Sequence, residues 1–251
     1  MNNLTMSGKQ KELVEDKSTI TLVGGAAGSG ATHALFLKAL SVANSPNARI
    51  IFIVSSPAQV KQSGGLLEVS QTIFSDTGAT YNKQNMSWEF PSGALLEFVV
   101  YNKGEDFYTQ AICMKDCSLL LIEDAKNYSV HDILCLHTRV RPKEGSGGSG
   151  LVMTSNPCTP DNRSFLYDWV KPLIDSDFGL PVRSDSPLTR KFSLACNGIR
   201  FHEGGDYVFK FVPMTVYDNK WLLESCPDYL SRLLSLDVKQ RKRFLLGSWL
   251  A

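Results

Sequence analysis

Residues 22–32 read Leu-Val-Gly-Gly-Ala-Ala-Gly-Ser-Gly-Ala-Thr and follow the pattern of a phosphate-binding loop whose lysine is missing. The P-loop pattern is G-x-x-x-x-G-K-[ST]. Gly25, Gly30 and Thr32 fit this pattern, whereas Ala31 occupies the lysine position. The backbone amides of such a loop form an anion-binding nest at a helix N-terminus. The lysine adds a mobile positive charge on the β- and γ-phosphates. The sequence therefore predicts nucleoside triphosphate binding by a loop that lacks one part of the hydrolytic machinery.

The segments on either side of the loop support this interpretation. Residues 18–23 are β-branched and apolar, and they predict a buried strand. Residues 32–40 have helical spacing, because Leu35, Ala39 and Leu40 lie near one face. Strand, glycine loop and helix is the order that the motif requires. The alternative is an ordinary glycine-rich turn between a strand and a helix.

The acidic pair Glu123-Asp124 follows the most apolar stretch of the chain, residues 118–122. A P-loop ATPase needs an acidic residue at the tip of a neighbouring strand to help hold Mg²⁺, and many carry an adjacent Glu that orients the attacking water. The usual order is Asp then Glu, so the pair is inverted here. Asp124 is shorter than Glu by one C–C bond, ~1.5 Å, and a misplacement of ~1 Å can cost ~10²-fold in rate. We interpret Thr32 and Glu123 as the metal site and Glu123 and Asp124 as catalytic; the alternative is a surface acidic pair.

Thr154, Ser155 and Asn156 end another apolar stretch, residues 151–154, and precede Pro157. Small hydroxyls and an amide can detect a γ-phosphate by hydrogen bonding and transmit its loss. We interpret the three residues as a coupling element, although Ser-Asn-Pro is also a common turn.

The remaining pattern predicts a mainly parallel α/β sheet flanked by helices, because apolar strands alternate with helical segments. Residues 172–210 show no readable motif. The further elements that we expect are a strand at 49–54, a helix at 65–74, a hairpin over 88–98 that turns at 91–93, and two short helices at 229–236 and 238–246, the last stopped by Gly247.

The composition is that of an ordinary globular protein, with 43% hydrophobic and 20% charged residues in 251. The net charge of +1 is low for a protein that binds nucleic acid tightly and statically, but a motor that touches DNA transiently need not be more basic. We find no signal peptide and no apolar run of about 18 residues, and so expect no membrane association. The six cysteines lack zinc-site spacing, and we interpret them as free thiols, mostly in the core, in a reducing cytosol.

Taken together, these motifs resemble the ATPase domain of the large terminase subunit of tailed bacteriophages, over nearly the whole chain. The tail is the most specific part of the resemblance, because a similar G-x-W closes the family's ATPase region. The segments that carry the resemblance are Gln10 in 7–11, the loop at 24–30, the strand pair at 88–98, Arg139 and Arg141 in 138–141, the coupling element at 154–157, and 211–213, 217–219, 227–230 and 245–249 of the tail.

The resemblance implies a P-loop NTPase fold of the RecA/ASCE-like type, with ATP and Mg²⁺ as cofactors. It implies a P-loop ATPase core over 1–210 and a helical lid or linker region over 211–251. A metal-dependent nuclease follows Trp249 in the family, and we expect it to be absent from this chain, which stops two residues later. The expected nucleotide-binding residues are Gln10, on the adenine, and Gly25, Ala26, Ala27, Gly28, Ser29, Gly30, Ala31 and Thr32.

The resemblance also implies a function, the ATP-driven translocation of viral genomic DNA into a capsid. The expected partners are double-stranded DNA, a portal protein and the small terminase subunit. We expect a ring of subunits on the capsid, a monomer when alone, and a location in the host cytoplasm. Arg139 and Arg141 are candidate arginine fingers for a neighbour's ATP, where such a charge is worth ~10³–10⁵ in rate; the alternative is pairing with acidic side chains.

Two other functions stay open at this stage. The departures at Ala31 and Glu123-Asp124 fit a catalytically degenerate terminase-like paralogue that acts as a binding or structural module. A helicase-like ATPase of another kind fits less well, because of the 218–249 tail and because no second RecA-like half is visible. The Gly/Ser run 145–150 reads as a flexible linker, natural or engineered.

Overall fold

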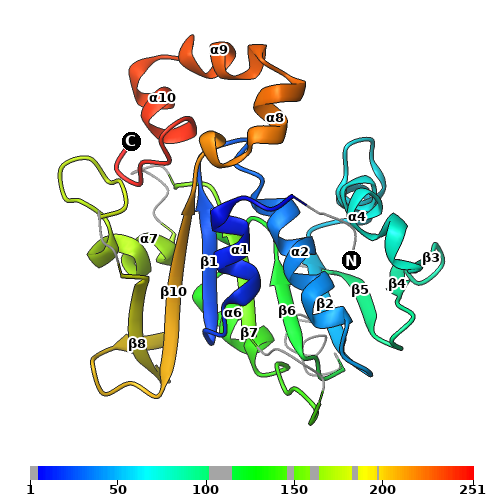
Figure 1. Cartoon of the computed structure of the whole chain (residues 1–251). Coiled ribbons are helices and arrows are strands. Elements are labelled where there is room, and N and C mark those ends of the chain that lie inside the picture. Colours follow the sequence, from blue (N-terminus) through cyan, green and yellow to red (C-terminus); the bar gives the residue numbers. More distant parts are fainter. Residues whose placement is uncertain (1–4, 102–114, 146–149, 159–163, 183–185, 197) are drawn as a thin grey trace. The chain divides into compact units, whose positions relative to one another are not determined.

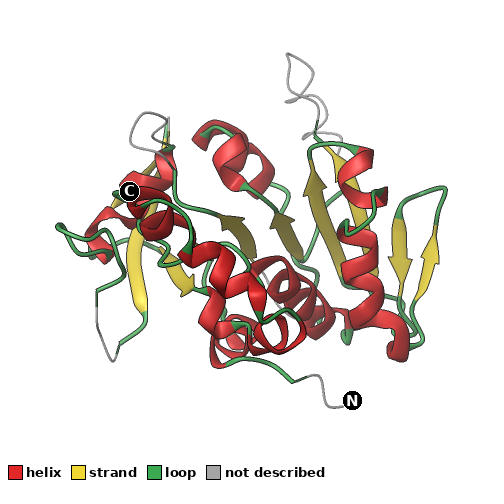
Figure 2. Cartoon of the chain, turned by 90° about the horizontal axis from the view of Figure 1, so that it is seen from above, coloured by secondary structure: helices red, strands yellow, loops and turns green. Residues whose placement is uncertain are grey.

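The computed structural model describes residues 5–101, 115–145, 150–158, 164–182, 186–196 and 198–251. The chain forms two compact units, each mixed α/β. Helices flank a mainly parallel sheet, as the sequence predicts (Figures 1 and 2). The first unit comprises Met1–Thr5, Thr32–Glu123 and His131–Val152, and the second comprises Met6–Ala31, Asp124–Val130 and Met153–Ala251.

The sheet of the first unit is built around β2 (Arg49–Val54). This strand runs parallel to β5 (Leu95–Val100) on one side and to β6 (Leu119–Ile122) on the other. β4 (Ser87–Glu89) is antiparallel to β5, which confirms the predicted hairpin, and β3 (Thr80–Asn82) continues the edge. The helical elements of this unit are α2 (Ala31–Ala43), α3 (Pro57–Lys61), α4 (Leu66–Phe74), the short 3-10 turn η1 (Ser75–Thr77) and α6 (Val130–His137).

Aromatic packing fixes α2 on this sheet. Phe36 of α2 stacks on Phe52 of β2 with ring centroids 5.1 Å apart. Phe74 of α4 meets Phe36 edge-on at 5.8 Å, and Phe98 of β5 lies 5.5 Å from Phe52. Each such ring buries about 150–250 Å² and offset or edge-on pairs add further stabilisation. This core holds the first turn of α2 and the carboxyl ends of the strands in fixed positions.

The second unit is organised by β1 (Ile20–Gly25), which is buried along its whole length. β1 runs parallel to β10 (Tyr207–Met214), from the pair Ile20–Phe209 to the pair Gly25–Met214. β10 also pairs with β8 (Leu188–Ala195), and β8 pairs with β9 (Gly198–Phe201); both pairs are antiparallel. The strand β7 (Gly150–Ser155) begins in the first unit and ends in the second.

The helical elements of the second unit include three short C-terminal helices, which gather at the carboxyl end of β10 in Figure 1. Their cluster of buried residues is Val216, Leu233 and Leu245. The helical elements of this unit are α1 (Gly8–Glu15), η2 (Ala125–Asn127), α7 (Phe165–Val170), η4 (Lys171–Leu173), η5 (Val216–Asp218), α8 (Lys220–Ser225), α9 (Asp228–Leu234) and α10 (Val238–Phe244).

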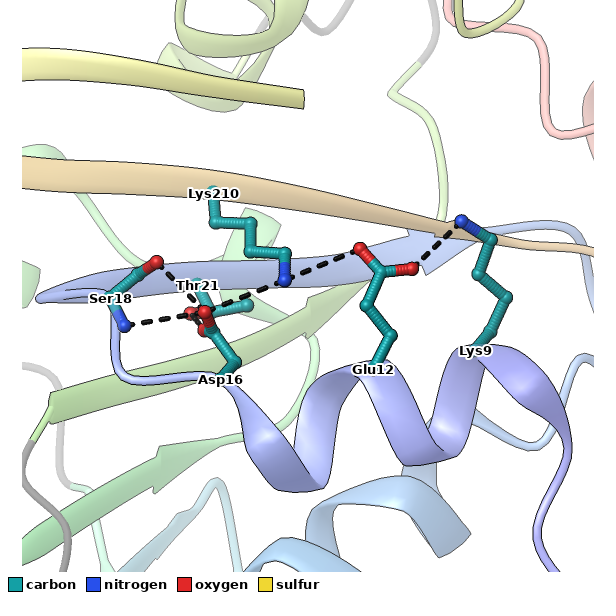
Figure 3. A network of polar contacts seen from close by, with 6 residues as sticks. All are labelled: Lys9, Glu12, Asp16, Ser18, Thr21 and Lys210. Atoms are coloured by element: carbon teal, nitrogen blue, oxygen red, sulfur yellow. Dashed lines mark hydrogen bonds and ion pairs between the residues drawn. The ribbon is translucent and has the colours of Figure 1, made fainter. Parts of the chain in front are cut away.

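A polar network ties α1 to β10 (Figure 3). Lys210 of β10 is buried, and its Nζ lies 3.3 Å from a Glu12 oxygen and 3.5 Å from Asp16 Oδ1. Lys9 pairs with the other Glu12 oxygen at 2.9 Å, and Thr21 of β1 donates a hydrogen bond to Asp16. Burial alone would raise the pKa of the Glu12 carboxyl, but the hydrogen bond and charge of Lys9, with Lys210, outweigh it and lower that pKa. The network therefore fixes the helix that carries Gln10.

The five cysteines among the described residues are free, as predicted. Only Cys117 and Cys158 of these are buried, so fewer lie in the core than expected. Burial, with the Asp116 charge, raises the pKa of the Cys117 thiol to about 12, although Arg49 and Arg139 oppose the shift. Cys117 is therefore a neutral, unreactive thiol at physiological pH. Most of the Gly/Ser run, residues 146–149, lies outside the described residues, as does Cys113.

Candidate nucleotide-binding site

The glycine loop leaves the end of β1 with the backbone that a phosphate loop requires. Gly25, Gly28 and Gly30 have φ values of 137°, 68° and 83°, a region that residues with a Cβ rarely adopt. Ala26 N donates to the Met214 carbonyl at 3.0 Å, which ties the start of the loop to β10. Ala27 N donates to the Phe244 carbonyl of α10 at 2.8 Å. The backbone amides of Ala26 and Ala27 are therefore hydrogen-bonded to protein carbonyls and are not free to bind a phosphate.

The loop is packed tightly by neighbours from the second unit. A Cβ on Gly24 would lie 2.1 Å from the Ser155 carbonyl oxygen of β7. A Cβ on Gly28 would lie 2.5 Å from Tyr229 Cε1, a ring of α9 whose burial raises the pKa of its phenol. Asn219 Nδ2 donates to the Gly28 carbonyl at 2.9 Å. The C-terminal helices therefore cover the loop and hold its shape.

Two side-chain amides converge on Gly30. The Nε2 of Gln10 and the Nδ2 of Asn219 both lie 3.4 Å from the position a Gly30 Cβ would occupy. The Gln10 oxygen accepts from Ser7 N at 2.9 Å in a capping box, which orients the amide nitrogen toward the loop. Gln10 therefore lies beside the glycine loop, as a neutral hydrogen-bond donor. Together with the loop backbone, these donors fit an anionic group such as a phosphate.

No lysine occupies position 31, where Ala31 begins α2. Two nearby lysines of α1 are already paired on their own helix. Lys9 lies 2.9 Å from Glu12, and Lys11 lies 3.9 Å from Glu15. Neither of these lysines thus stands in for the missing cation in this arrangement.

In the first unit, Thr32 and Glu123, the two residues that we interpret from the sequence as a metal site, contact each other. The Thr32 hydroxyl donates a hydrogen bond to Glu123 Oε1, at the carboxyl end of β6. Gln59 Nε2 donates to Glu123 Oε2 at 3.0 Å, and the Gln59 oxygen accepts from Ser55 N at 2.8 Å. Gln59 is a residue that the sequence analysis missed, since no motif marks it.

This donor set can be compared with what a divalent cation needs. Within the described ranges, no group of three or more His, Cys, Asp or Glu side chains could hold a metal ion. Mg²⁺, however, keeps several waters and is usually bound by one or two carboxylates together with substrate phosphates. The Glu123 carboxylate and the Thr32 hydroxyl therefore fit Mg²⁺ that is bound together with a nucleotide. They are too few to bind a metal ion without it.

Asp124, the next residue, has a strained backbone in the second unit. Its φ and ψ are 54° and 52°, in the left-handed region. Its amide donates to Thr154 Oγ1 at 3.3 Å, and its carboxylate pairs with Lys126 at 3.2 Å. Strained residues of this kind concentrate at functional sites. The carboxylate expected to orient water is thus engaged by a lysine two residues further on.

The coupling element Thr154, Ser155 and Asn156 lies at the end of β7. Thr154 is the acceptor for the Asp124 amide, while the Ser155 hydroxyl donates to the Asn156 carbonyl at 2.8 Å. Thr154 and Ser155 are both buried. The Pro157 carbonyl that follows accepts from Arg243 Nε of α10 at 2.9 Å. The element thus links Asp124 to the C-terminal helices.

Arg139 and Arg141, the candidate arginine fingers, lie in the first unit around Asp116. Arg139 Nη1 is 3.9 Å and Arg141 Nη1 is 3.6 Å from Asp116 Oδ1. The side chain of Arg139 is 16% exposed and that of Arg141 is 58% exposed. Both arginines therefore pair with an acid, as the alternative interpretation expects, and Arg141 is the more accessible of the two.

Comparison with known proteins places this geometry in context. No protein-family model and no curated protein matches the sequence. The large terminase of a thermophilic bacteriophage aligns with a TM-score of 0.63 at 12% identity, over 98% of this chain and 54% of that one. This chain has the fold of a large-terminase ATPase domain. The large terminase of the same phage in complex with ATP-gamma-S aligns with a TM-score of 0.61, 13% identity and coverage of 98% and 53%.

A second relative of this terminase fold is an isolated ATPase domain. That of the Thermus phage P74-26 large terminase has a TM-score of 0.55 at 11% identity, over 96% of this chain and 92% of that one. This chain spans about half the length of the thermophilic phage terminase that it matches. The terminase-like ATPase fold expected from the sequence is therefore confirmed. Among the described residues, no helix is long and apolar enough to span a membrane.

Proposed function

We propose that this chain is the ATPase domain of a large terminase subunit, which binds ATP with Mg²⁺ and drives the translocation of viral double-stranded DNA into a capsid. The observation that carries the proposal is the hydrogen bond from Thr32 to Glu123. It joins the hydroxyl that ends the glycine loop to the carboxylate that ends β6, and these are the two protein groups that a P-loop ATPase places around Mg²⁺. The resemblance to a terminase that has been solved with ATP-gamma-S supports the same function.

The loop and its neighbours would bind the nucleotide. Amides of the stretch from Gly28 to Ala31 would hold the phosphates, because those of Ala26 and Ala27 already donate to protein carbonyls, and Gln10 and Asn219 would contribute neutral donors beside Gly30. Bound Mg²⁺ would neutralise charge on the phosphate oxygens, and Thr32 and Glu123 would hold it. Asp124 would orient the attacking water once Lys126 has moved away.

The remaining residues would connect hydrolysis to motion. Thr154, Ser155 and Asn156 would respond to the γ-phosphate, since Thr154 holds the Asp124 amide. Arg141, which is exposed, would reach the ATP of a neighbouring subunit more readily than Arg139. This assignment requires a homo-oligomeric ring, assembled with a portal protein and the small subunit in the host cytoplasm. Residues 1–210 would form the ATPase core, and residues 211–251 would form the lid or linker region.

The second candidate function is a catalytically degenerate terminase-like module. Two observations favour it. Ala31 stands where the P-loop pattern has a phosphate-binding lysine, and Lys126 forms an ion pair with the Asp124 carboxylate. A module of this kind would keep the fold and bind a partner without turning over ATP.

Calorimetric titration with ATP and ADP, each with Mg²⁺ and with EDTA, tests the proposal. We expect binding that Mg²⁺ strengthens, and loss of the Mg²⁺-dependent part alone in a Glu123→Gln variant. The matched control is Glu97→Gln, since Glu97 pairs with Arg49 elsewhere in the first unit. Absence of nucleotide binding to the unaltered chain under both conditions would overturn the proposal and favour the degenerate module.

A further inference from the structure

Gln10 of α1 has a buried side chain whose amide nitrogen has no protein acceptor. The residue is only 7% exposed. Its oxygen accepts from Ser7 N, and among the described residues its Nε2 donates to no protein atom. Nε2 is not one of the side-chain atoms that are both fully buried and unpartnered, so it keeps contact with solvent. The nitrogen is therefore a donor that an entering ligand can use.

This nitrogen lies beside the part of the glycine loop that holds phosphates in P-loop proteins. It is 3.4 Å from the position that a Gly30 Cβ would occupy, and Gly30 directly precedes the position of the missing lysine. The backbone amides of this part of a P-loop cradle phosphate groups. The other amide at this point, Asn219 Nδ2, already donates to the Gly28 carbonyl at 2.9 Å. Gln10 thus supplies the side-chain donor whose two hydrogens are both available here.

The orientation of the Gln10 amide follows from its hydrogen bonds. Ser7 N is a donor, so the Gln10 atom that lies 2.9 Å from it must be the oxygen. Ser7 Oγ in turn accepts from Gln10 N at 3.3 Å, which completes the capping box. Turning the amide over would place one donor against another. Nε2 therefore stays on the side of the loop.

The network of Figure 3 fixes the helix that carries this amide. Lys210 Nζ of β10 lies 3.3 Å from Glu12 and 3.5 Å from Asp16, both on the C-terminal side of Gln10. Moving α1 away from β10 would separate these buried charges, which is costly. With Lys9, the network contains two lysines and two carboxylates and so adds no net charge beside the loop. The donor that α1 offers is neutral, and its position is fixed.

This geometry suits a phosphate better than a base. A glutamine recognises adenine with two hydrogen bonds, in which its oxygen accepts from N6 and its nitrogen donates to N7. Both atoms must then face the same edge of the base. Here the oxygen is bonded to the backbone of Ser7, and the nitrogen lies beside Gly30. A phosphate oxygen needs only a donor, and its charge strengthens the hydrogen bond.

We propose that Gln10 binds an oxygen of the nucleotide's phosphate chain and not its base, as a neutral counterpart of the lysine that position 31 lacks. The ligand class that Gln10 recognises is therefore a polyphosphate chain, whichever base it carries. Gln10 takes no part in the choice between adenine and guanine. The inference rests on the proposed function, because it assumes that the glycine loop binds a nucleotide.

Calorimetric titration with tripolyphosphate, ATP and GTP, each with Mg²⁺, compares the unaltered chain with Gln10→Glu. Glu keeps the oxygen that accepts from Ser7 N in the capping box but replaces the donor with a negatively charged oxygen. We expect all three ligands to bind more weakly to the variant by about tenfold or more, the value of a hydrogen bond to a charged group. The ratio of ATP affinity to GTP affinity should stay the same.

The matched control is Gln240→Glu, which makes the same change of charge at an exposed residue of the same unit. It should leave the three affinities close to those of the unaltered chain. Equal losses in Gln10→Glu and Gln240→Glu would overturn the inference, because the effect would then come from net charge. Circular dichroism and thermal unfolding check that each variant is folded. If Gln10→Glu is not, Gln10→Met removes the donor without adding charge and takes its place.

The outcomes separate this inference from the proposed function. An unchanged affinity for tripolyphosphate in Gln10→Glu would overturn the inference, and a loss of ATP binding alone would assign Gln10 to the base. ATP binding by the unaltered chain without any binding of tripolyphosphate would overturn it as well. In each of these cases the unaltered chain still binds ATP, so the proposed function stands. If the unaltered chain binds none of the three ligands, both the inference and the proposed function fail.

Discussion

The Thr32 hydroxyl donates a hydrogen bond to the Glu123 carboxylate, although 91 residues separate the two in the sequence. The second Glu123 oxygen accepts from Gln59 Nε2 at 3.0 Å. Each oxygen of the carboxylate thus has a protein donor, and the donors fix its orientation. A hydrogen-bond donor that orients a metal ligand without contacting the metal strongly affects metal affinity, and Gln59 is such a donor to Glu123.

The Gln59 contact leads to the first prediction. Gln59→Met removes the donor at a similar side-chain length, and we expect the Mg²⁺-dependent part of ATP affinity to fall by about tenfold. Calorimetry with Mg²⁺ and with EDTA measures this part directly. The control is Ser55→Ala, which removes a hydroxyl that contacts Gln59 without touching Glu123. An equal loss of affinity in EDTA would show that Gln59 acts on the nucleotide rather than through Glu123.

Position 31 gives the second prediction. Ala31→Lys restores the cation of the phosphate loop, and a single transition-state charge donor is typically worth about 10²–10³ in rate. We therefore expect ATP turnover with Mg²⁺ to rise by that factor. Ala31→Met is the control, because it lengthens the side chain without adding charge. If both variants are as slow as the unaltered chain, the inverted pair Glu123-Asp124 is disabling as well, and the degenerate module becomes the better account.

The third prediction concerns the strained residue Asp124. Thr154→Val replaces the hydroxyl that accepts the Asp124 amide with a methyl group of similar shape. Because Asp124 is half-exposed and water can reach part of it, we expect a loss at the lower end of the usual range, about 1 kcal/mol in the free energy of unfolding. Urea denaturation measures this value, and Thr154→Ser, which keeps the acceptor, should remain close to the unaltered chain. Equal stability of the Val and Ser variants would contradict the role given to this hydrogen bond.

The fourth prediction concerns pH. Lys9 and Lys210, acting against burial, lower the pKa of Glu12 below the ordinary value of 4.5. A carboxyl whose pKa is lower in the folded state stabilises the fold above its unfolded pKa, and this contribution is lost as the pH falls through the folded pKa. The free energy of unfolding should therefore fall below about pH 4.5, and Glu12→Gln should reduce that dependence.

Urea denaturation at a series of acidic pH values measures this effect. Glu15→Gln is the control, since Glu15 lies on the same helix, is exposed, and pairs only distantly with Lys11 at 3.9 Å. If Glu12→Gln and Glu15→Gln leave the same pH dependence as the unaltered chain, the network of Figure 3 does not contribute to acid stability.

Much of the fold follows from local patterns in the sequence. The strand expected at 49–54 is β2, the helix expected at 65–74 is α4, and the helices expected at 229–236 and 238–246 are α9 and α10. The predicted stop at Gly247 agrees with its φ of 73°. These elements are either continuously apolar or have clear helical spacing, and so their own residues specify them.

Other elements depend on contacts that no local pattern reveals. β8 has one buried residue, Phe192, among exposed and partly buried ones, and it is a strand because β10 and β9 flank it. α8 has no buried residue and depends on its Asn219 cap, so its sequence gives little helical signal. Residues 172–210 therefore showed no readable motif, although β8, β9 and the first residues of β10 lie there.

The residues of the candidate site also fall into those that the sequence predicts and those that it does not. Thr32 and Glu123 could be paired from the P-loop pattern, because both belong to known motifs. Gln59 and Asn219 could not, since a single amide has no signature outside its spatial context. The ion pair between Asp124 and Lys126 could not be predicted from the sequence either, because it depends on the left-handed backbone of Asp124.

The contact between Gly28 and Tyr229 also constrains how this protein can evolve. Any side chain at position 28 would overlap the Tyr229 ring, since a Cβ there would lie 2.5 Å from Cε1. Position 28 is therefore restricted both by its φ of 68° and by the Tyr229 ring, and homologues with a larger residue at 28 should carry a smaller one at 229. A tyrosine thus limits the residues that the glycine loop can accept 201 positions earlier in the sequence.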